Sequence, residues 1–237
     1  MTLTPDLPRA DPWPEQRAAL VREANRLRPL GLATGTSGNL SVRIDMGALG
    51  GMLITPSGIA YDTLQPADMV PVEFTGPGTA AWQHPLDPSS EWLMHQAVYQ
   101  ARPEAGAVVH GHPTYATVLA IQGLEIPPLH YMIAAAGGAP IRCAPYFTYG
   151  TVELSQAAVA ALDGRKACLL AHHGLLAFER DLARAMWLAG EVETLAQQTV
   201  MCLQLGGPKL LPLAEIDRVV GKFSRYGLKA RPAEPGG

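Results

Sequence analysis

The sequence predicts an α/β protein, a layered α/β/α sandwich around a mostly antiparallel central sheet. Short apolar stretches bounded by glycine and proline turns alternate with longer segments of helical periodicity, without an internal repeat. Hydrophobic residues make up 48% of the 237 residues, which is enough for a packed core, so we expect one domain over residues 1–237. A barrel of eight βα units is disfavoured because too few such units are present.

In the first half of the chain, one helix precedes a set of short strands. Residues 1–13 lack periodicity and are expected to form a loose arm, and apolar residues recur at helical spacing over 14–30. Serine is a good helix cap, so a second helix is expected to start at Ser89 or Ser90 and to stop before Pro103. Strands are expected at 40–44, 52–55 and 69–74, with a long hairpin connection at 45–51 and an irregular segment at 75–88.

The second half predicts strands and helices in alternation, with an apolar stretch at 129–136 closed by two glycines. A Pro/Gly-rich tail at 227–237 is expected to be disordered. The expected strands cover 107–112, 141–144, 167–171 and 175–178, and the expected helices cover 114–121, 152–162, 181–205 and 214–226.

Charge and hydropathy disfavour several classes of partner. A net charge of −3 and a pI near 6.2 leave no general basic surface for nucleic acid. The apolar runs are far shorter than the ~20 residues that cross a bilayer, and the N-terminus lacks a signal-peptide pattern. We therefore expect a cytoplasmic protein with no nucleic-acid or membrane partner. The three cysteines have no CxxC spacing, so neither a disulfide framework nor a thiolate zinc site is indicated.

Two histidines at the end of the apolar run 107–112 indicate a cation site. Side chains alternate along a strand, so His110 and His112 point the same way, and a neutral imidazole is the commonest nitrogen ligand of zinc. His172 and His173 also end a buried apolar strand and would reach the same edge of the sheet. Neighbours on a strand point to opposite faces, so only one of this pair can face the metal, and the pattern leaves the choice open.

Glu91 is the natural fourth group of such a site. It lies in the first turn of the expected helix, where the helix dipole favours an anion. A solvated carboxylate that only stabilises the helix start is the alternative on local grounds.

Three short segments have the composition of an anion site: 38–39, 55–58 and 89–90. Each offers small residues, hydroxyl or amide groups, and backbone N–H groups in turn or helix-start geometry, which bind anions without net positive charge. A single segment of this kind is more often a plain turn or cap. Their significance depends on convergence in space.

Taken together, these motifs resemble the class II aldolase/adducin family. The resemblance covers about residues 20 to 226 and is nearest to the members that cleave L-fuculose 1-phosphate. It implies a metal-dependent carbon–carbon lyase that cleaves a phosphorylated ketose to dihydroxyacetone phosphate and an aldehyde. The motifs that carry it are Gly35-Thr36-Ser37-Gly38-Asn39-Leu40-Ser41, Ile54-Thr55-Pro56-Ser57-Gly58, Ser89-Ser90-Glu91-Trp92, Val109-His110-Gly111-His112, the stretch from His130 to Gly138, and His172-His173-Gly174-Leu175.

The resemblance also implies roles for individual residues. It implies zinc, or another divalent metal, at His110, His112 and His173, with Glu91 as the catalytic carboxylate that can also ligate the metal. Thr55 lies beside the implied phosphate pocket and is ranked lower. The residues implied to form that pocket are Gly38, Asn39, Ser57, Gly58, Ser89 and Ser90.

Two tyrosines are implied to complete the site. Tyr131 matches a tyrosine that reaches the substrate across a subunit boundary, and Tyr226 matches a C-terminal tyrosine that closes the site. Read without the resemblance, both would be interface or core aromatics. The resemblance accordingly implies a homotetramer with active sites at subunit interfaces.

Four other functions are kept as alternatives. A pentulose-phosphate epimerase usually has aspartate where this chain has Glu91, whereas a methylthioribulose-1-phosphate dehydratase also uses a metal and a glutamate. A non-catalytic interaction domain lacks the metal ligands, and a zinc hydrolase leaves the anion segments unexplained. Gly111 and the loops 45–51 and 75–88 depart from the fuculose-phosphate pattern, and we expect both loops to lie near the anion pocket.

Overall fold

A single mixed sheet of eight strands forms the middle of the molecule. The computed structural model describes residues 12–223, so most of the expected N-terminal arm and all of the expected tail lie outside the described residues. All strand pairs are antiparallel except β6–β7, as the sequence predicted. In sheet order the strands are β4 (Thr79–Ala81), β3 (Val70–Gly76), β2 (Gly51–Ile54), β1 (Asn39–Ile44), β5 (Ala107–Gly111), β8 (Gly174–Glu179), β7 (Ala167–Leu170) and β6 (Cys143–Ala144).

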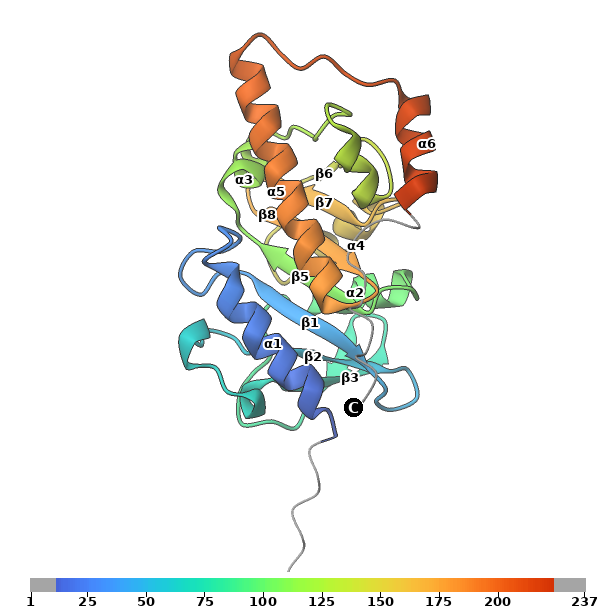
Figure 1. Ribbon diagram of the computed structural model, residues 1–237. Coiled ribbons are helices and arrows are strands. Elements are labelled where there is room, and N and C mark those ends of the chain that lie inside the picture. Colours follow the sequence, from blue (N-terminus) through green and yellow to red (C-terminus); the bar gives the residue numbers. More distant parts are fainter. Residues whose placement is uncertain (1–11, 224–237) are drawn as a thin grey trace, which may run out of the picture.

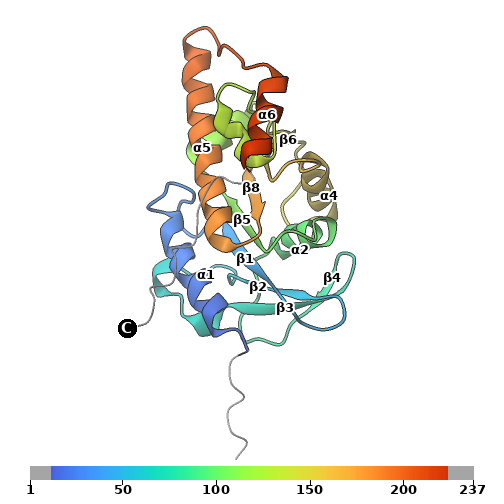
Figure 2. The ribbon, with the colours of Figure 1, turned by 45° about the vertical axis from the view of Figure 1, so that its right-hand side comes forward.

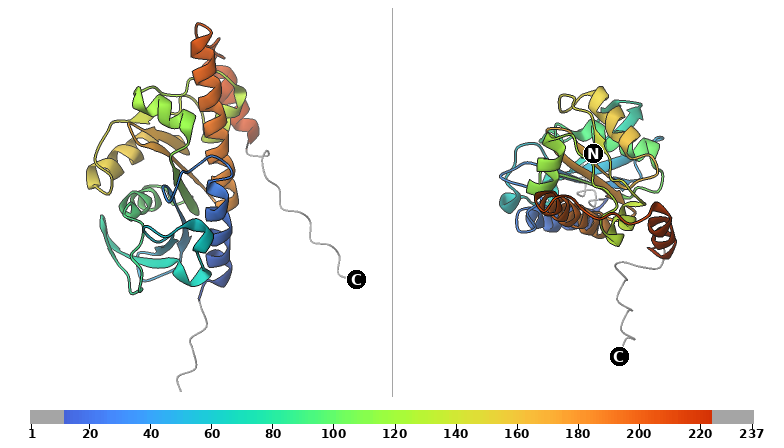
Figure 3. Two further views of the ribbon diagram at one scale, coloured as in Figure 1. Left: turned by 90° about the vertical axis from the view of Figure 1, so that its left-hand side faces the viewer. Right: turned by 90° about the horizontal axis from the view of Figure 1, so that it is seen from above.

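Helices cover both faces of the sheet, which makes the predicted α/β/α sandwich (Figures 1 and 2). Apolar side chains separate into two clusters, one on each face of the sheet. One face packs against α1 (Pro14–Leu27), α3 (Thr114–Ile121), α5 (Leu182–Gln204) and α6 (Leu213–Phe223), and the other packs against α2 (Trp92–Ala101) and α4 (Val152–Ala161). The 23-residue α5 is long enough to extend beyond the sheet (Figure 3).

The register of the central strands brings three strand ends together. Asn39, the first residue of β1, pairs with His110 near the end of β5, and Gly111 pairs with Leu175 near the start of β8. These residues are buried, because the strands run through the middle of the sheet and are covered on both sides. This end of the sheet carries the candidate site.

Several local predictions differ from the structure. The segment 75–88 is not wholly irregular, because it contains β4, and the expected strand at 141–144 is reduced to Cys143–Ala144. The apolar stretch 129–136 forms the 3₁₀ helix η3 (Tyr131–Ala136). Two further 3₁₀ turns, η1 (Tyr61–Thr63) and η2 (Pro66–Asp68), connect β2 to β3.

The second helix begins later than predicted. It starts at Trp92, with Glu91 as its N-terminal flanking residue, and neither serine before it caps the helix with its side chain. Instead, the Ser89 hydroxyl accepts a hydrogen bond from the Glu91 amide at 3.3 Å. Tight i to i+3 bonds, from the Trp92 amide to the Ser89 carbonyl and from the Met94 amide to the Glu91 carbonyl, replace the expected first turn.

Two further properties concern the whole described chain. Within residues 12–223, no helix combines the length and the apolar character needed to cross a bilayer. All three cysteines are free, and Cys168 is buried whereas Cys143 and Cys202 are half-buried.

Candidate metal centre and active site

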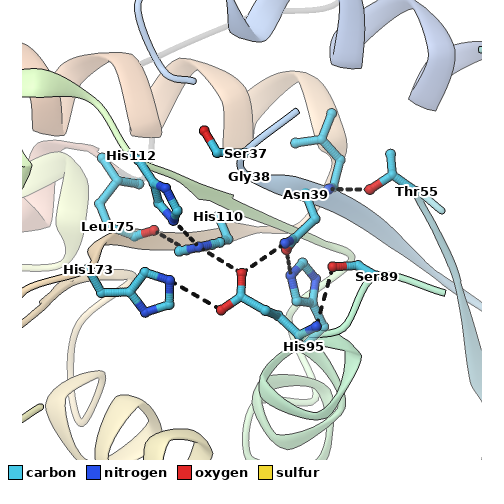
Figure 4. A network of polar contacts seen from close by, with 12 residues as sticks. Ser37, Gly38, Asn39, Thr55, Ser89, His95, His110, His112, His173 and Leu175 are labelled. Carbon is cyan, nitrogen blue, oxygen red and sulfur yellow. Dashed lines mark hydrogen bonds and ion pairs between the residues drawn. The ribbon is translucent and has the colours of Figure 1, made fainter. Parts of the chain in front are cut away.

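Four side chains suited to a divalent cation meet at the end of the central strands. The ligand atoms of Glu91, His110, His112 and His173 all lie within 4.8 Å of one another (Figure 4). His110 Nε2 is 3.0 Å from Glu91 Oε2 and 3.0 Å from His112 Nε2. His173 Nε2 is 3.2 Å from the other carboxylate oxygen, Glu91 Oε1. The structure therefore brings together all four residues predicted as metal ligands.

The orientation of His110 fits a metal ligand. Its Nδ1 lies 2.8 Å from the main-chain carbonyl of Leu175, an oxygen that can only accept, so Nδ1 carries the proton and a neutral ring presents the Nε2 lone pair to the cluster. The three imidazole rings are edge-on to one another, with centroids 4.8 to 4.9 Å apart. Nitrogen lone pairs and a carboxylate that converge in this way repel one another unless positive charge lies between them. Three imidazoles and one carboxylate are a donor set that zinc accepts.

Electrostatics keep three of the four groups, Glu91, His112 and His173, in the protonation states that bind a cation, whereas Glu91 raises the pKa of His110. Burial by itself would raise the pKa of Glu91, but the charge and hydrogen bond of His110, the charge of His173 and the Asn39 amide hold it well below its usual range. Burial and the neighbouring His110 lower the pKa values of His112 and His173 to about 4. At neutral pH the carboxylate is ionised and these two imidazoles are neutral, as metal ligation requires.

A turn decides which histidine of the pair 172–173 joins the cluster. Strand β7 ends at Leu170 and β8 begins at Gly174, so neither histidine continues a strand, contrary to the assumption behind the prediction. His172 adopts a left-handed backbone conformation, with φ of 55°, and its ring packs edge-on against Tyr146. His173 is thereby turned toward Glu91. The outcome agrees with the choice that the family resemblance implied.

The three predicted anion segments converge beside the four metal-site residues. A backbone hydrogen bond from the Ser89 amide to the Thr55 carbonyl, at 3.0 Å, joins two of them, and the Ser57 amide donates to the carbonyl of Asp87, just before the second, at 3.1 Å. The third segment adjoins β5 through the Asn39–His110 pair. A cavity of about 310 Å³ is lined by Thr36, Ser37, Gly38, Asn39, Pro56, Ser57, Gly58, Ser89, Ser90, Glu91, His112, Tyr149 and His173. All six predicted phosphate-pocket residues line the same cavity as three of the predicted metal ligands, Glu91, His112 and His173.

The remaining predicted features do not line this cavity or fall outside the described residues. Tyr131 is 46% exposed and does not line it, and Tyr226 lies outside the described residues. Thr55 is buried and accepts a hydrogen bond from the Leu40 amide at 3.2 Å. Neither the loop 45–51 nor the loop 75–88 contributes a lining residue, but the end of the second lies beside the anion pocket, where the Asp87 carbonyl accepts from the Ser57 amide and Pro88 pairs with Pro56. The expectation that the loops lie near the pocket therefore holds for 75–88 and is wrong for 45–51. The loop 45–51 connects the far end of β1 to β2.

Two residues near the site were missed by sequence reasoning. Tyr149 lines the cavity although it is 64% exposed, and no periodicity or motif around it signals this position. His95 is fully buried behind Asn39, where its ring nitrogen contacts the side-chain oxygen (Figure 4). Its place one helical turn after Glu91 was the available signal, because residues i and i+4 share a helix face.

The α/β/α fold and the group of four possible metal ligands beside an anion-binding cavity are typical of a metal-dependent enzyme, and comparison with known proteins gives its family. The chain belongs to the class II aldolase family, since the family description "Class II Aldolase and Adducin N-terminal domain" matches residues 18–200. It is 49% identical to a 5-methylthioribulose-1-phosphate/5-deoxyribulose-1-phosphate aldolase of Rhodospirillum rubrum, over 92% of this chain and 96% of the relative. It is also 49% identical to an L-fuculose phosphate aldolase of Escherichia coli K12, over 84% and 90% of the two chains.

A solved structure supports the same assignment. An L-fuculose 1-phosphate aldolase superposes with a TM-score of 0.82 and 40% sequence identity, covering 89% of this chain and 96% of that one. The family match and these aldolase relatives show that the chain is a carbon–carbon lyase, so the non-catalytic and hydrolase alternatives are wrong. The two relatives at 49% identity differ in the sugar that their names give.

Proposed function

We propose that the protein is a zinc-dependent aldolase that cleaves a ketose 1-phosphate, such as L-fuculose 1-phosphate, into dihydroxyacetone phosphate and an aldehyde. The observation that carries this proposal is the shared cavity, in which metal ligands and anion-binding segments face each other. A ketose 1-phosphate needs both, because its phosphate lies one carbon away from the carbonyl. Glu91, His110, His112 and His173 would hold the cation, which when bound would supply Lewis acidity toward negative charge that develops on substrate oxygen.

The chain's own residues position the substrate and move its protons. Backbone amides and hydroxyls of the segments 38–39, 57–58 and 89–90 bind the phosphate. In the condensation direction, the ionised Glu91 accepts a proton from the carbon beside the carbonyl of dihydroxyacetone phosphate, and in cleavage it returns that proton. Tyr131 takes the proton of the hydroxyl that becomes the aldehyde, and Tyr226 closes the site.

A second substrate is supported by the comparisons. The relative named for 5-methylthioribulose 1-phosphate and 5-deoxyribulose 1-phosphate is as similar in sequence and matches a larger share of this chain. These sugars share the dihydroxyacetone phosphate half with L-fuculose 1-phosphate and differ only in the aldehyde released. Dehydration of methylthioribulose 1-phosphate and epimerisation of a pentulose phosphate are the competing reactions, and neither yields dihydroxyacetone phosphate.

The exposed position of Tyr131 supports an oligomeric active site. It lies on η3 and does not line the cavity of its own chain, which fits a tyrosine that reaches the substrate from a neighbouring subunit. We therefore propose a homotetramer with sites at the interfaces, acting on a small-molecule sugar phosphate in the cytoplasm.

The proposal is tested by assaying purified, zinc-loaded protein against L-fuculose 1-phosphate and 5-methylthioribulose 1-phosphate, with separate detection of dihydroxyacetone phosphate and of the aldehyde. Glu91→Gln keeps the size of the side chain and removes its capacity to accept a proton. We expect it to lower kcat by about 10²- to 10⁴-fold, the usual contribution of a general acid–base group.

Glu125→Gln, at an exposed glutamate outside the cavity, is the matched control and is expected to retain wild-type activity. Phosphoglycolohydroxamate, which mimics the enediolate and carries a phosphate, is expected to inhibit the wild type. Full cleavage activity in Glu91→Gln would show that the carboxylate does not carry the proton. Release of water without an aldehyde would assign the chain to the dehydratases.

A further inference from the structure

A continuous chain of buried side chains ends on the Glu91 carboxylate. The hydroxyl of Tyr99 lies 2.8 Å from that of Ser41, which lies 2.7 Å from His95 Nδ1. On the other side of the ring, His95 Nε2 lies 2.5 Å from Asn39 Oδ1, and Asn39 Nδ2 donates to Glu91 Oε2 at 3.1 Å. Ser41 and His95 are fully buried, and Asn39 and Tyr99 are at most 4% exposed.

The donor and acceptor of every hydrogen bond from Tyr99 to Glu91 follow from the ionised Glu91 carboxylate at one end of the series. An ionised carboxylate only accepts, so Asn39 must turn its amide nitrogen toward Glu91 and its oxygen toward His95. The ring then has its proton on Nε2, and Nδ1 accepts from Ser41. Ser41 has only one hydroxyl proton, so it accepts in turn from Tyr99. Each donor points toward the carboxylate.

The orientation of Asn39 has consequences for the Glu91 carboxylate. The two ends of an amide have nearly the same shape, so packing alone does not choose between them. In the observed orientation the Asn39 amide nitrogen donates to Glu91, and Asn39 is also one of the residues that line the cavity. A flipped amide would place its oxygen against the Glu91 carboxylate, where the interaction is repulsive.

We propose that His95 is a positioning residue that acts through Asn39: its Nε2–H fixes the Asn39 amide so that the amide nitrogen faces the Glu91 carboxylate. The inference rests on the proposed aldolase function, in which Glu91 carries a proton and the segment 38–39 binds phosphate.

Burial supports the single-proton state of the ring that this role needs. Burial, and after it the charge of His110, lower the pKa of His95 to about 3, against the opposing influence of Glu91. A neutral ring donates from one nitrogen only, so Ser41 decides which nitrogen that is.

Two amide substitutions separate the donor function from mere bulk. In His95→Gln the side-chain nitrogen reaches the position of Nε2 and can still donate to Asn39. In His95→Asn the shorter side chain reaches only the Nδ1 position and faces Ser41. We expect kcat/KM for the cleaved ketose phosphate to fall about 10- to 100-fold in His95→Asn, as for loss of a hydrogen bond to a charged group, and to be largely restored in His95→Gln.

A double-mutant cycle tests whether His95 acts through Asn39. In the Asn39→Ala background no amide remains to be oriented, so adding His95→Asn is expected to change kcat/KM by less than about twofold. Val98→Ala removes buried volume from the same helix at a side chain that is not part of this series of hydrogen bonds, and it is the control for stability. Its activity per folded molecule is expected to equal that of the wild type.

The inference is overturned if His95→Asn is as active as the wild type, if His95→Gln is as damaged as His95→Asn, or if His95→Asn costs the same in both backgrounds. These results require an active wild type, and an inactive wild type would instead contradict the proposed function. An independent readout is ¹⁵N NMR of the zinc-loaded wild type, which identifies the protonated imidazole nitrogen. We expect Nε2–H for His95, and an Nδ1–H or doubly protonated ring contradicts the inference without reference to activity.

Discussion

His95 and His110 are both fully buried, yet their pKa values move in opposite directions. Burial lowers the pKa of each ring, but His110 lies 3.0 Å from the Glu91 carboxylate, whose charge and hydrogen bond outweigh burial and raise its pKa. The Asn39 amide separates His95 from the same carboxylate, so burial dominates there. The distance of each buried histidine from the Glu91 carboxylate therefore decides whether its pKa is raised or lowered.

The lowered pKa of His95 predicts acid sensitivity of the fold. His95 titrates near 6.5 in the unfolded chain and near 3 in the folded protein, so between these values the unfolded state binds more protons. Its contribution to stability is fully present above about pH 6.5 and is lost as the pH falls toward 3, with a slope of at most ~1.4 kcal/mol per pH unit. His112 and His173 act in the same direction, and the raised pKa of His110 opposes them.

The measurement is denaturant unfolding of metal-free wild type and His95→Gln between pH 4 and pH 7. Glutamine does not titrate, so the variant is expected to lose less free energy of unfolding on acidification. The slope of this free energy against pH is expected to differ between the two proteins by an amount that corresponds to at most one bound proton. The charges of Glu91 and His110, which face this position, are present in both proteins and cancel in the comparison. Parallel pH dependences would contradict the assigned pKa shift.

At the level of residues, the sequence predicted the side chains of the candidate metal site better than the surrounding residues that orient them. Spacing predicted that His110 and His112 face the same way, and the structure confirms it. The choice between His172 and His173 depended on a left-handed turn that strand alternation does not describe. His95 was missed because its only sequence signal, the position four residues after Glu91, is weak for a single histidine, and because its role depends on residues distant in sequence.

At the level of elements, hydrophobic patterning predicted the central strands and the long helices. Strand β4 was missed because its three residues are mostly exposed and follow a Gly-Pro-Gly turn, so they carry no apolar alternation. The start of α2 was misplaced because Ser89 uses its hydroxyl and carbonyl in a tight turn rather than in a helix cap. Both errors arise where local hydrogen bonds, rather than burial, fix the backbone.

The close approach of β5 and β8 beside the metal site predicts a specific requirement for glycine. A Cβ on Gly174 would lie 2.3 Å from the Gly111 carbonyl oxygen and 2.8 Å from a ring carbon of His112. A Cβ on Gly111 would lie 2.4 Å from the Leu32 carbonyl oxygen, which explains why this chain has no polar side chain between its two histidines.

We expect Gly174→Ala to lower the free energy of unfolding by about 1–3 kcal/mol and to weaken zinc binding, measured by competition with a chelator, because the backbone must shift where His112 is held. Gly190→Ala is the matched control, since it lies in α5 with nothing within 4 Å of a new Cβ. Alanine is the better helix former, so the control is expected to be stabilised by up to about 1 kcal/mol with unchanged zinc affinity. Equal zinc affinities in both variants would argue against the strand contact as a support of the site.

At the level of the whole molecule, the site depends on convergence that periodicity does not encode. Each anion segment resembled an ordinary turn in the sequence, and only the pairing of β1 with β5 and the contacts between residues 55–57 and 87–89 bring the segments to one cavity. The family resemblance supplied this arrangement because it carries information about the complete fold. Residue patterns alone predicted the separate segments of the site but not how close they lie to one another.

The proposed oligomer predicts that two inactive variants restore each other. The four metal-site residues come from one chain in the structure, whereas Tyr131 lies outside that chain's cavity. In a randomly mixed tetramer of Glu91→Gln and Tyr131→Phe subunits, about a quarter of the sites combine an intact Glu91 with an intact Tyr131 from the neighbour. Co-expression is therefore expected to recover about a quarter of wild-type activity. The matched control mixes Glu91→Gln with His173→Gln subunits. Because Glu91 and His173 belong to the same subunit's site, no mixture of these two variants contains an intact site. Absence of recovery in the first mixture, despite a hybrid tetramer verified by native mass spectrometry, would place Tyr131 outside the catalytic machinery.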